Sequence, residues 1–195
     1  MARFLSKDAT KDERNALKNK WKNFWKQDKE DSKDIINSVV DKDLEYILDH
    51  KELIASVSCR EDKKQSCKVA HIRDSIVNSG KIYKVNSIPL LAFKDCVNLR
   101  EVKIPEGVDR LLRGTFMNCK SLEKVEIPGS VKFLIGGTFL DCTNLKIVEF
   151  ENIEDMEIQA GAFLGCNEEA MVKDKSTGKE WKLKDFKNEV CKGIN

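Results

Sequence analysis

A repeat of 23 or 24 residues in the middle of the chain is the feature that most constrains its fold. The phenylalanines that mark the repeat are Phe93, Phe116, Phe139 and Phe163. Four cysteines keep the same intervals, namely Cys96, Cys119, Cys142 and Cys166. Two residue types held in one register indicate a recurring structural unit, and a period in the twenties is typical of a solenoid of short coils.

Each repeat contains the pattern Leu-x-x-Val-x-Ile, which predicts a short strand. In one copy Val102 and Ile104 lie on one side of the strand, and the residue between them lies on the other. Pro105 and Pro128 follow the strand in two copies and help to end it, because proline has no amide donor. The sequence therefore predicts an α/β fold in which a solenoid of parallel strands spans residues 81–173.

The recurring cysteines are predicted to be buried and chemically inert. A thiol is a small, weakly polar group that fits where coils converge and where a larger side chain would overpack. Zinc sites normally bring their ligands in closely spaced pairs, whereas equivalent residues of stacked coils form a row about 5 Å apart. We expect free thiols in a reducing compartment, with no metal and no disulfide ladder.

The motif "TFxxCxxLxxVxIP", as it stands from Thr115 to Pro128, resembles the BspA-like class of leucine-rich repeats. The resemblance covers about residues 82–172. It implies a leucine-rich-repeat solenoid and a non-enzymatic binding module, of a class often found on the surfaces of bacterial and parasite cells. The last repeat departs from the pattern, because Glu151 stands where proline is expected and Glu168 stands where leucine is expected.

Residues 1–80 precede the repeats and are predicted to form a helical N-terminal region. Thr10 and Glu13 fit a capping box, and the apolar residues that follow at helical spacing are Leu17, Trp21, Phe24 and Trp25. The apolar spacing from Ile35 to Ile54 fits one bent helix or two short ones. A further helix is expected between Ser66 and Gly80.

Residues 174–195 are predicted to cap the far end of the solenoid, since the last coil would otherwise expose the face that its neighbours bury. The apolar residues expected at this closing edge are Trp181, Leu183, Phe186 and Val190.

The charge of the whole chain argues against a generally basic nucleic-acid binder. Charged residues make up 35% of the sequence, yet the net charge is only +2. No run approaches the roughly 18 to 20 apolar residues that cross a bilayer, and the first residues lack the pattern of a secretory signal. We expect a cytoplasmic protein that makes no membrane contact.

The outward positions of the predicted strands carry charges whose signs alternate between most neighbours, and we call this surface the strand face. Its residues are Arg100, Glu101, Lys103, Glu123, Lys124, Glu126, Lys146 and Glu149. Opposite charges on adjacent strands stabilise a sheet slightly, so a solvated, self-neutralising surface is one interpretation. The other is a docking site for a protein with complementary charges. Carboxylates interleaved with lysines argue against phosphate binding.

The first predicted helix allows a second kind of contact. Trp21 and Trp25 either pack into the core or anchor a partner. The basic residues that flank them are Lys11, Lys18, Lys22 and Lys26, and with stacking tryptophans they form the alternative hypothesis of a nucleic-acid or nucleoprotein binder. Steep salt dependence would distinguish this binding from protein docking.

Catalytic and metal-binding patterns are weak in this sequence. Cys59, Cys67 and His71 give a loose zinc spacing without a fourth ligand, and His50 is the only other histidine. The stretch "STGKEW" superficially resembles a phosphate loop, but the earlier glycine and the serine or threonine after the lysine are missing. We therefore expect no enzyme activity, cofactor or metal. The leading hypothesis is a non-catalytic module that docks on another protein, with a role as inhibitor or adaptor as its extension.

Overall fold

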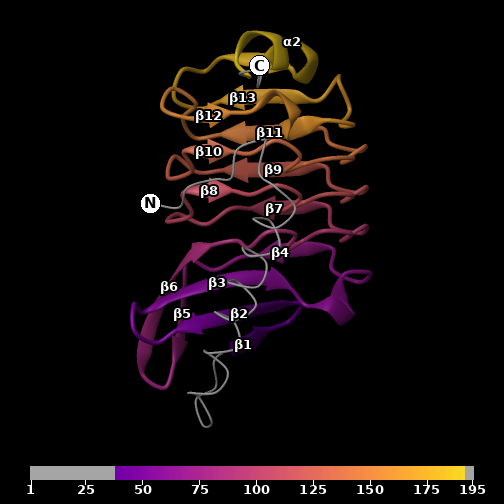
Figure 1. Ribbon diagram of the computed structural model, residues 1–195. Coiled ribbons are helices and arrows are strands. Elements are labelled where there is room, and N and C mark those ends of the chain that lie inside the picture. The colour runs from indigo at the N-terminus through magenta and orange to yellow at the C-terminus, as the bar shows by residue number, and fades with distance from the viewer. Residues whose placement is uncertain (1–37, 192–195) are drawn as a thin grey trace, which may run out of the picture. The chain divides into compact units, whose positions relative to one another are not determined.

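The computed structural model describes residues 38–191, which form three β-sheets and one α-helix (Figure 1). The first half of the described chain contains the strands β1 (Ser38–Asp41), β2 (Leu44–Asp49), β3 (Ile54–Cys59), β4 (Val69–His71), β5 (Ser75–Asn78) and β6 (Lys81–Ser87). The strands of the second half are β7 (Glu101–Lys103), β8 (Arg110–Leu111), β9 (Lys124–Ile127), β10 (Phe133–Leu134), β11 (Ile147–Phe150), β12 (Glu157–Ile158), β13 (Met171–Asp174) and β14 (Glu180–Lys182). The helical segments are the 3-10 turns η1 (Glu61–Lys63) and η2 (Ala160–Phe163) and the α-helix α2 (Leu183–Glu189). The helix predicted to begin near Thr10 lies outside the described residues.

The repeats form coils that stack through two parallel sheets (Figure 1). The six-stranded sheet has the order β14-β13-β11-β9-β7-β4, and the three-stranded sheet has the order β12-β10-β8. All neighbours from β4 to β13 are parallel, and Val102, Val125 and Val148 occupy one position of the register. The predicted solenoid of parallel strands is thus confirmed for these residues.

A stack of phenylalanine rings runs through the centre of the coils. The ring centroids of successive phenylalanines lie 5.2, 5.3 and 5.3 Å apart from Phe93 to Phe163. All four side chains are fully buried. Each stacked pair contributes about 0.5–1.5 kcal/mol beyond the burial of its area, so the same contact fixes the spacing of every coil.

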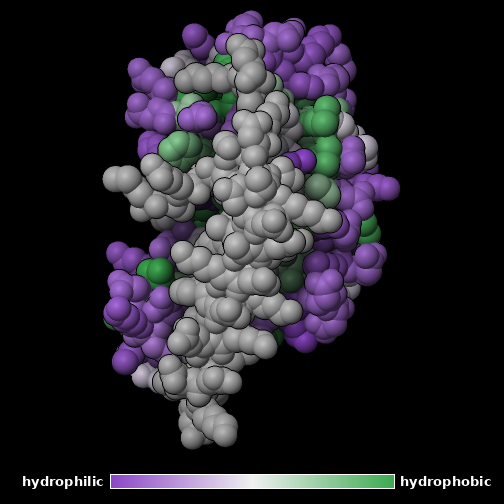
Figure 2. Space-filling model, in the orientation of Figure 1, coloured by the Kyte–Doolittle hydropathy of each residue, from purple (hydrophilic) through white to green (hydrophobic). Residues whose placement is uncertain are grey.

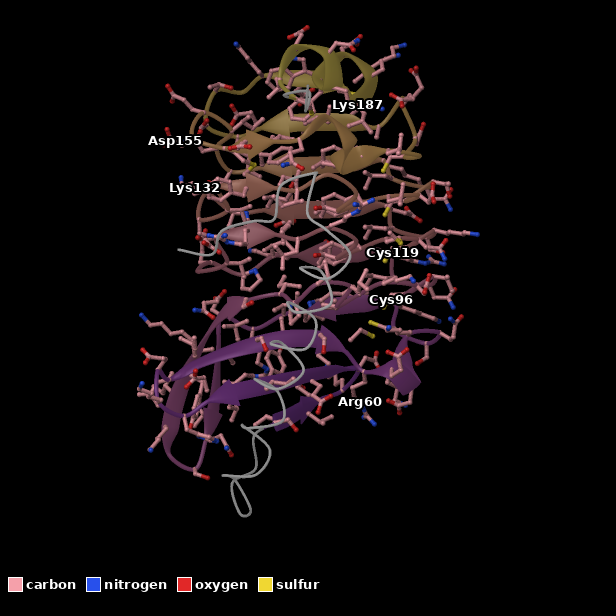
Figure 3. The ribbon with its side chains drawn as sticks, in the orientation of Figure 1. Arg60, Cys96, Cys119, Lys132, Asp155 and Lys187 are labelled. Carbon is pink, nitrogen blue, oxygen red and sulfur yellow. The ribbon has the colours of Figure 1, made fainter. Side chains whose placement is uncertain are left out.

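The cysteines of the repeat hold adjacent coils together through hydrogen bonds. The thiol of Cys119 donates to the Phe93 carbonyl at 3.1 Å, Cys142 donates to Phe116 at 3.1 Å, and Cys166 donates to Phe139 at 3.0 Å. Figure 3 shows Cys96 and Cys119 one above the other in neighbouring coils. All cysteines of the described residues are free, and burial raises the pKa of the Cys119 thiol to about 12. The small side chain therefore both fits the interior and gives a buried carbonyl a second donor, beside the amide of the carbonyl's own coil.

The turn before each cysteine requires a left-handed backbone. Asp95, Asn118 and Asp141 have φ values of 64°, 61° and 60°, and the equivalent residue of the last repeat is Gly165. Aspartate and asparagine tolerate this conformation better than most residues. The Asn118 amide also donates to the Asp95 carboxylate at 2.7 Å, which joins two turns.

The prediction of a helix or helices between Ile35 and Ile54 is wrong for the described part, which forms the antiparallel pair β1 and β2 and the start of β3. Strand β2 buries Leu44, Tyr46 and Leu48 and exposes the residues between them, which is the period of a strand. The turn at Lys42, with a φ of 56°, separates two short strands whose apolar residues happen to fit helical spacing.

The helix predicted from Ser66 to Gly80 is also wrong. This segment contains β4 and β5, and Gly80, with a φ of 73°, lies in the turn of the β5–β6 hairpin and does not end a helix. Strand β5 buries Ile76 and exposes Val77, as expected of a strand with one covered face.

The stack of coils begins earlier than the repeat in the sequence indicates. Strand β4 pairs in parallel with β7, and Ala70 takes the register position of Val102. The β5–β6 hairpin is inserted in this first coil and joins the five-stranded sheet, whose order is β1-β2-β3-β6-β5. Residues 38–80 therefore belong to the same compact unit as the repeats.

The C-terminal segment closes the six-stranded sheet. Strand β14 pairs antiparallel with β13, and α2 follows it. Leu183 and Phe186, two of the four apolar residues expected at this edge, are fully buried. The cap presents hydrophilic side chains outward (top of Figure 2). Nothing in residues 38–191 supplies a helix of the length and apolarity that a membrane span requires.

The thiol hydrogen bonds give a first testable prediction. Cys142→Ala removes a buried side chain and one of the two donors to the Phe116 carbonyl, which keeps the Cys119 amide at 3.3 Å. We therefore expect a loss of about 1–3 kcal/mol in the free energy of unfolding. Urea denaturation followed by circular dichroism measures it. Cys191→Ala is the control, since this half-buried residue lies outside the thiol row of Cys119, Cys142 and Cys166, and it should cost less than half as much. Equal costs would contradict the role given to the row.

Candidate functional site

The strand face lies on the outer side of the six-stranded sheet. In the register, Glu101 pairs with Lys124 and Lys124 with Ile147, while Lys103 pairs with Glu126 and Glu126 with Glu149. The repeat period predicts these rows, because residues 23 positions apart in the sequence face each other on neighbouring strands. Their side chains point away from the core because the alternate residues, such as Val125, are fully buried. The sheet thus holds the charges of the strand face at fixed spacing.

Most charges of the strand face are joined in ion pairs. The Lys124 ammonium lies 2.7 Å from Glu126 and 3.4 Å from Glu149, and Lys146 lies 2.7 Å from Glu123. The hydrogen bond from Lys124 lowers the pKa of Glu126 below its usual value, and the same bond raises the pKa of Lys124. These contacts agree with the interpretation of a self-neutralising face. A face whose charges are paired in this way is also compatible with the docking of a partner protein.

Two predicted residues stand apart from this network. Arg100 and Glu101 are exposed and belong to no ion pair within residues 38–191. The other predicted contact residues lie outside the described residues, and they are Trp21, Trp25, Lys11, Lys18, Lys22 and Lys26.

A groove of about 170 Å³ opens where the parallel strands end, and we call it the strand-end groove. Its lining residues are Asp74, Lys103, Ile104, Pro105, Glu106, Glu126, Ile127, Pro128, Glu149, Glu151 and Lys175. It shares Lys103, Glu126 and Glu149 with the strand face. Sequence reasoning missed the rest of its charged lining, although Glu151 in the place of a proline was a signal in the repeat.

The loose zinc pattern does not form a site. His71 is exposed on β4 in the row that continues through Lys103, whereas Cys59 and Cys67 are buried. His50 instead lies 2.6 Å from the Tyr83 hydroxyl through its Nδ1 atom. Among residues 38–191, no three histidine, cysteine, aspartate or glutamate side chains are placed to hold a metal ion.

Lys124 is the common counter-ion of two neighbouring carboxylates, which gives a second prediction. Lys124→Gln should destabilise the fold by about 1 kcal/mol or less at pH 7, because Glu126 and Glu149 would face each other without it. The pKa of Glu126 is lowered in the folded state, so this stabilisation is present above its usual value of 4.5 and is lost as the pH falls through the lowered value.

Urea denaturation of both proteins at a series of pH values measures the difference. The control is Lys146→Gln, whose ion pair with Glu123 is well exposed to solvent and whose effect should be smaller than that of Lys124→Gln. If the difference in the free energy of unfolding between the wild type and Lys124→Gln grew as the pH fell, the role given to Lys124 would be contradicted.

Comparisons with known proteins agree with the fold. The chain is similar to a leucine-rich repeat protein from Bacteroides ovatus, with 26% identity and a TM-score of 0.53, over 69% of this chain and 36% of that one. It thus spans about a third of that protein's length. A leucine-rich repeat protein from Bacteroides capillosus shares 22% identity with a TM-score of 0.57, over 67% of this chain and 93% of that one. The comparison with curated proteins gives no match.

A family model described as the BspA type leucine rich repeat region matches residues 74–192 in six copies. The match begins at Asp74, directly before β5 of the inserted hairpin, and runs through the C-terminal cap. It therefore covers the stacked phenylalanines, the thiol row and the strand face together. The chain belongs to the BspA-type leucine-rich repeat family.

Proposed function

We propose that this chain is a non-catalytic module that binds another protein through the strand face. The observation that carries the proposal is the fixed placement of eight charges, five on the parallel strands and three directly before them, on a sheet whose inner residues are fully buried. A surface held in this way orders few residues on binding, so little conformational entropy opposes association. Binding of proteins is also the general role of leucine-rich repeats, to which the chain belongs.

The charge pattern favours selectivity over raw affinity. The strand face carries four basic and four acidic side chains, so its net charge is zero. Such a face attracts no partner by net charge, and it discriminates partners by the match of their charges to its own. By covering the surface of its partner, the module would act as an inhibitor, or as an adaptor if a second surface is engaged. A cytoplasmic location stays a prediction.

Charge reversal on the strand face tests the proposal. The double variant Arg100→Glu, Lys146→Glu changes two exposed residues of the face and should abolish capture of the partner from a lysate of the native cell. The matched control is Arg110→Glu, Lys132→Glu, in which an arginine and a lysine near the three-stranded sheet are reversed. Capture followed by mass spectrometry should give the same partner for the wild type and the control.

The same experiment distinguishes protein docking from the alternative hypothesis of nucleic-acid binding. Docking through the strand face should survive nuclease treatment and moderate salt, whereas binding through several phosphates weakens steeply as salt rises. Capture that persists in the strand-face variant, or that disappears equally in the control, would count against the proposed surface. Thermal unfolding of each variant checks that the fold is retained.

A further inference from the structure

The strand-end groove has a strong excess of negative charge. Five carboxylates and two ammonium groups line it, an excess of three negative charges. Lys124 contacts two of these carboxylates from outside the lining, which leaves an excess of two. Asp74 and Glu106 take part in no ion pair within residues 38–191. The groove therefore attracts a positively charged group, unlike the neutral strand face as a whole.

Two of the carboxylates lie side by side on neighbouring strands. Glu126 and Glu149 are paired in the register, and their side chains are only 22% and 20% exposed. Like charges directly opposite each other destabilise a sheet, and partial burial reduces their screening by salt. This arrangement costs stability in the unbound protein, and an additional cation in the groove would relieve the repulsion.

The lysines inside the groove hold these carboxylates only loosely. Lys103 lies 4.0 Å from Glu126 and its side chain is 77% exposed. Lys175 lies 3.6 Å from Glu149 and is 46% exposed. Ion pairs of this kind contribute little, so an incoming cation can take their place at small cost.

A backbone carbonyl adds another acceptor to the groove. At the end of β9, the Ile127 carbonyl accepts a hydrogen bond of 2.9 Å from the Glu151 amide of the next coil. One coil earlier, the residue equivalent to Glu151 is Pro128, which has no N–H. The Ile104 carbonyl in the groove therefore does not receive the corresponding bond. The proline that ends the strand thus leaves an acceptor without its ladder donor.

A group that fits this site carries positive charge and several donors. The volume of about 170 Å³ equals that of roughly five or six waters at about 30 Å³ each, enough for one long side chain. A guanidinium has five N–H donors, no acceptor and a permanent charge, and it pairs with carboxylates in a bidentate manner. We infer that the strand-end groove receives an arginine side chain from an exposed segment of a partner protein. The inference rests on the proposed function, since it names the chemistry of the contact at one edge of the strand face.

Fluorescence anisotropy of a labelled short peptide of alternating arginine and glycine, titrated with the full chain, tests this inference. The double variant Glu126→Gln, Glu149→Gln removes both central carboxylates with little change of shape and should weaken binding about tenfold or more. The control Glu154→Gln, Glu157→Gln removes the same charge from exposed positions near the three-stranded sheet, outside both the groove and the strand face, and should change binding by less than about twofold.

Two further arms separate specific recognition from general attraction. A peptide with citrulline in place of arginine keeps the shape without the charge and should show no binding at the concentrations that saturate the arginine peptide. Pro128→Ala supplies an N–H that can bond to the Ile104 carbonyl. This variant should lower the affinity for the arginine peptide by about threefold without loss of thermal stability.

Equal weakening by both double variants, or equal binding of the citrulline peptide, would overturn the inference. If the wild type captures its partner through the strand face but does not bind the arginine peptide, the groove has no such role and the proposed function stands. Groove-dependent binding of the arginine peptide supports the inference even where capture through the strand face fails.

Discussion

The contact between a cysteine of one coil and a phenylalanine carbonyl of the coil before it is the interaction on which the rest of the structure depends. Each of these buried carbonyls has two lone pairs, and an amide of its own coil donates to it at 3.2 to 3.3 Å, which leaves room for a second donor. The thiols of Cys119, Cys142 and Cys166 supply that second donor from the next coil, and they are small enough for the rings to stack at about 5.3 Å. Because one residue type satisfies both demands, the coils stack in a single register, and that register positions every charge on the outside.

The outer charges show what such a register makes possible. Strand pairing places Glu126 beside Glu149 although like charges repel, and Lys124 is the nearest residue that offsets this repulsion. In a loop, the same side chains could turn away from one another. On a stacked sheet they cannot move far, because their neighbours along each strand are anchored in the core. A fixed pattern of charge, including its unfavourable parts, is therefore a property of the scaffold that a partner can recognise.

The sequence was informative where the repeat is regular and misleading where it is not. Phe93, Phe116 and Phe139 follow one another at the same interval of 23 residues. This period was enough to predict the parallel coils and the rows of the strand face, since the register of the strands follows directly from it. Residues 38–80 contain no such repetition, and Leu44 and Leu48 satisfy helical and strand spacing alike, so pattern alone favoured the wrong element. The strand-end groove was not predictable, because Asp74 lies there through the pairing of β4 with β7, which the repeat does not show, and Lys175 through the last strand of the stack.

The inserted β5–β6 hairpin has a wider consequence for how coils of this type diversify. It lengthens the step from Ala70 to Val102 to 32 residues, against 23 from Val102 to Val125, yet both pairs keep the same register. Extra chain in a surface connection costs little closure entropy. The bend after each strand is therefore a place where evolution, or a protein engineer, can graft new sequence beside the recognition surface while the scaffold itself stays unchanged.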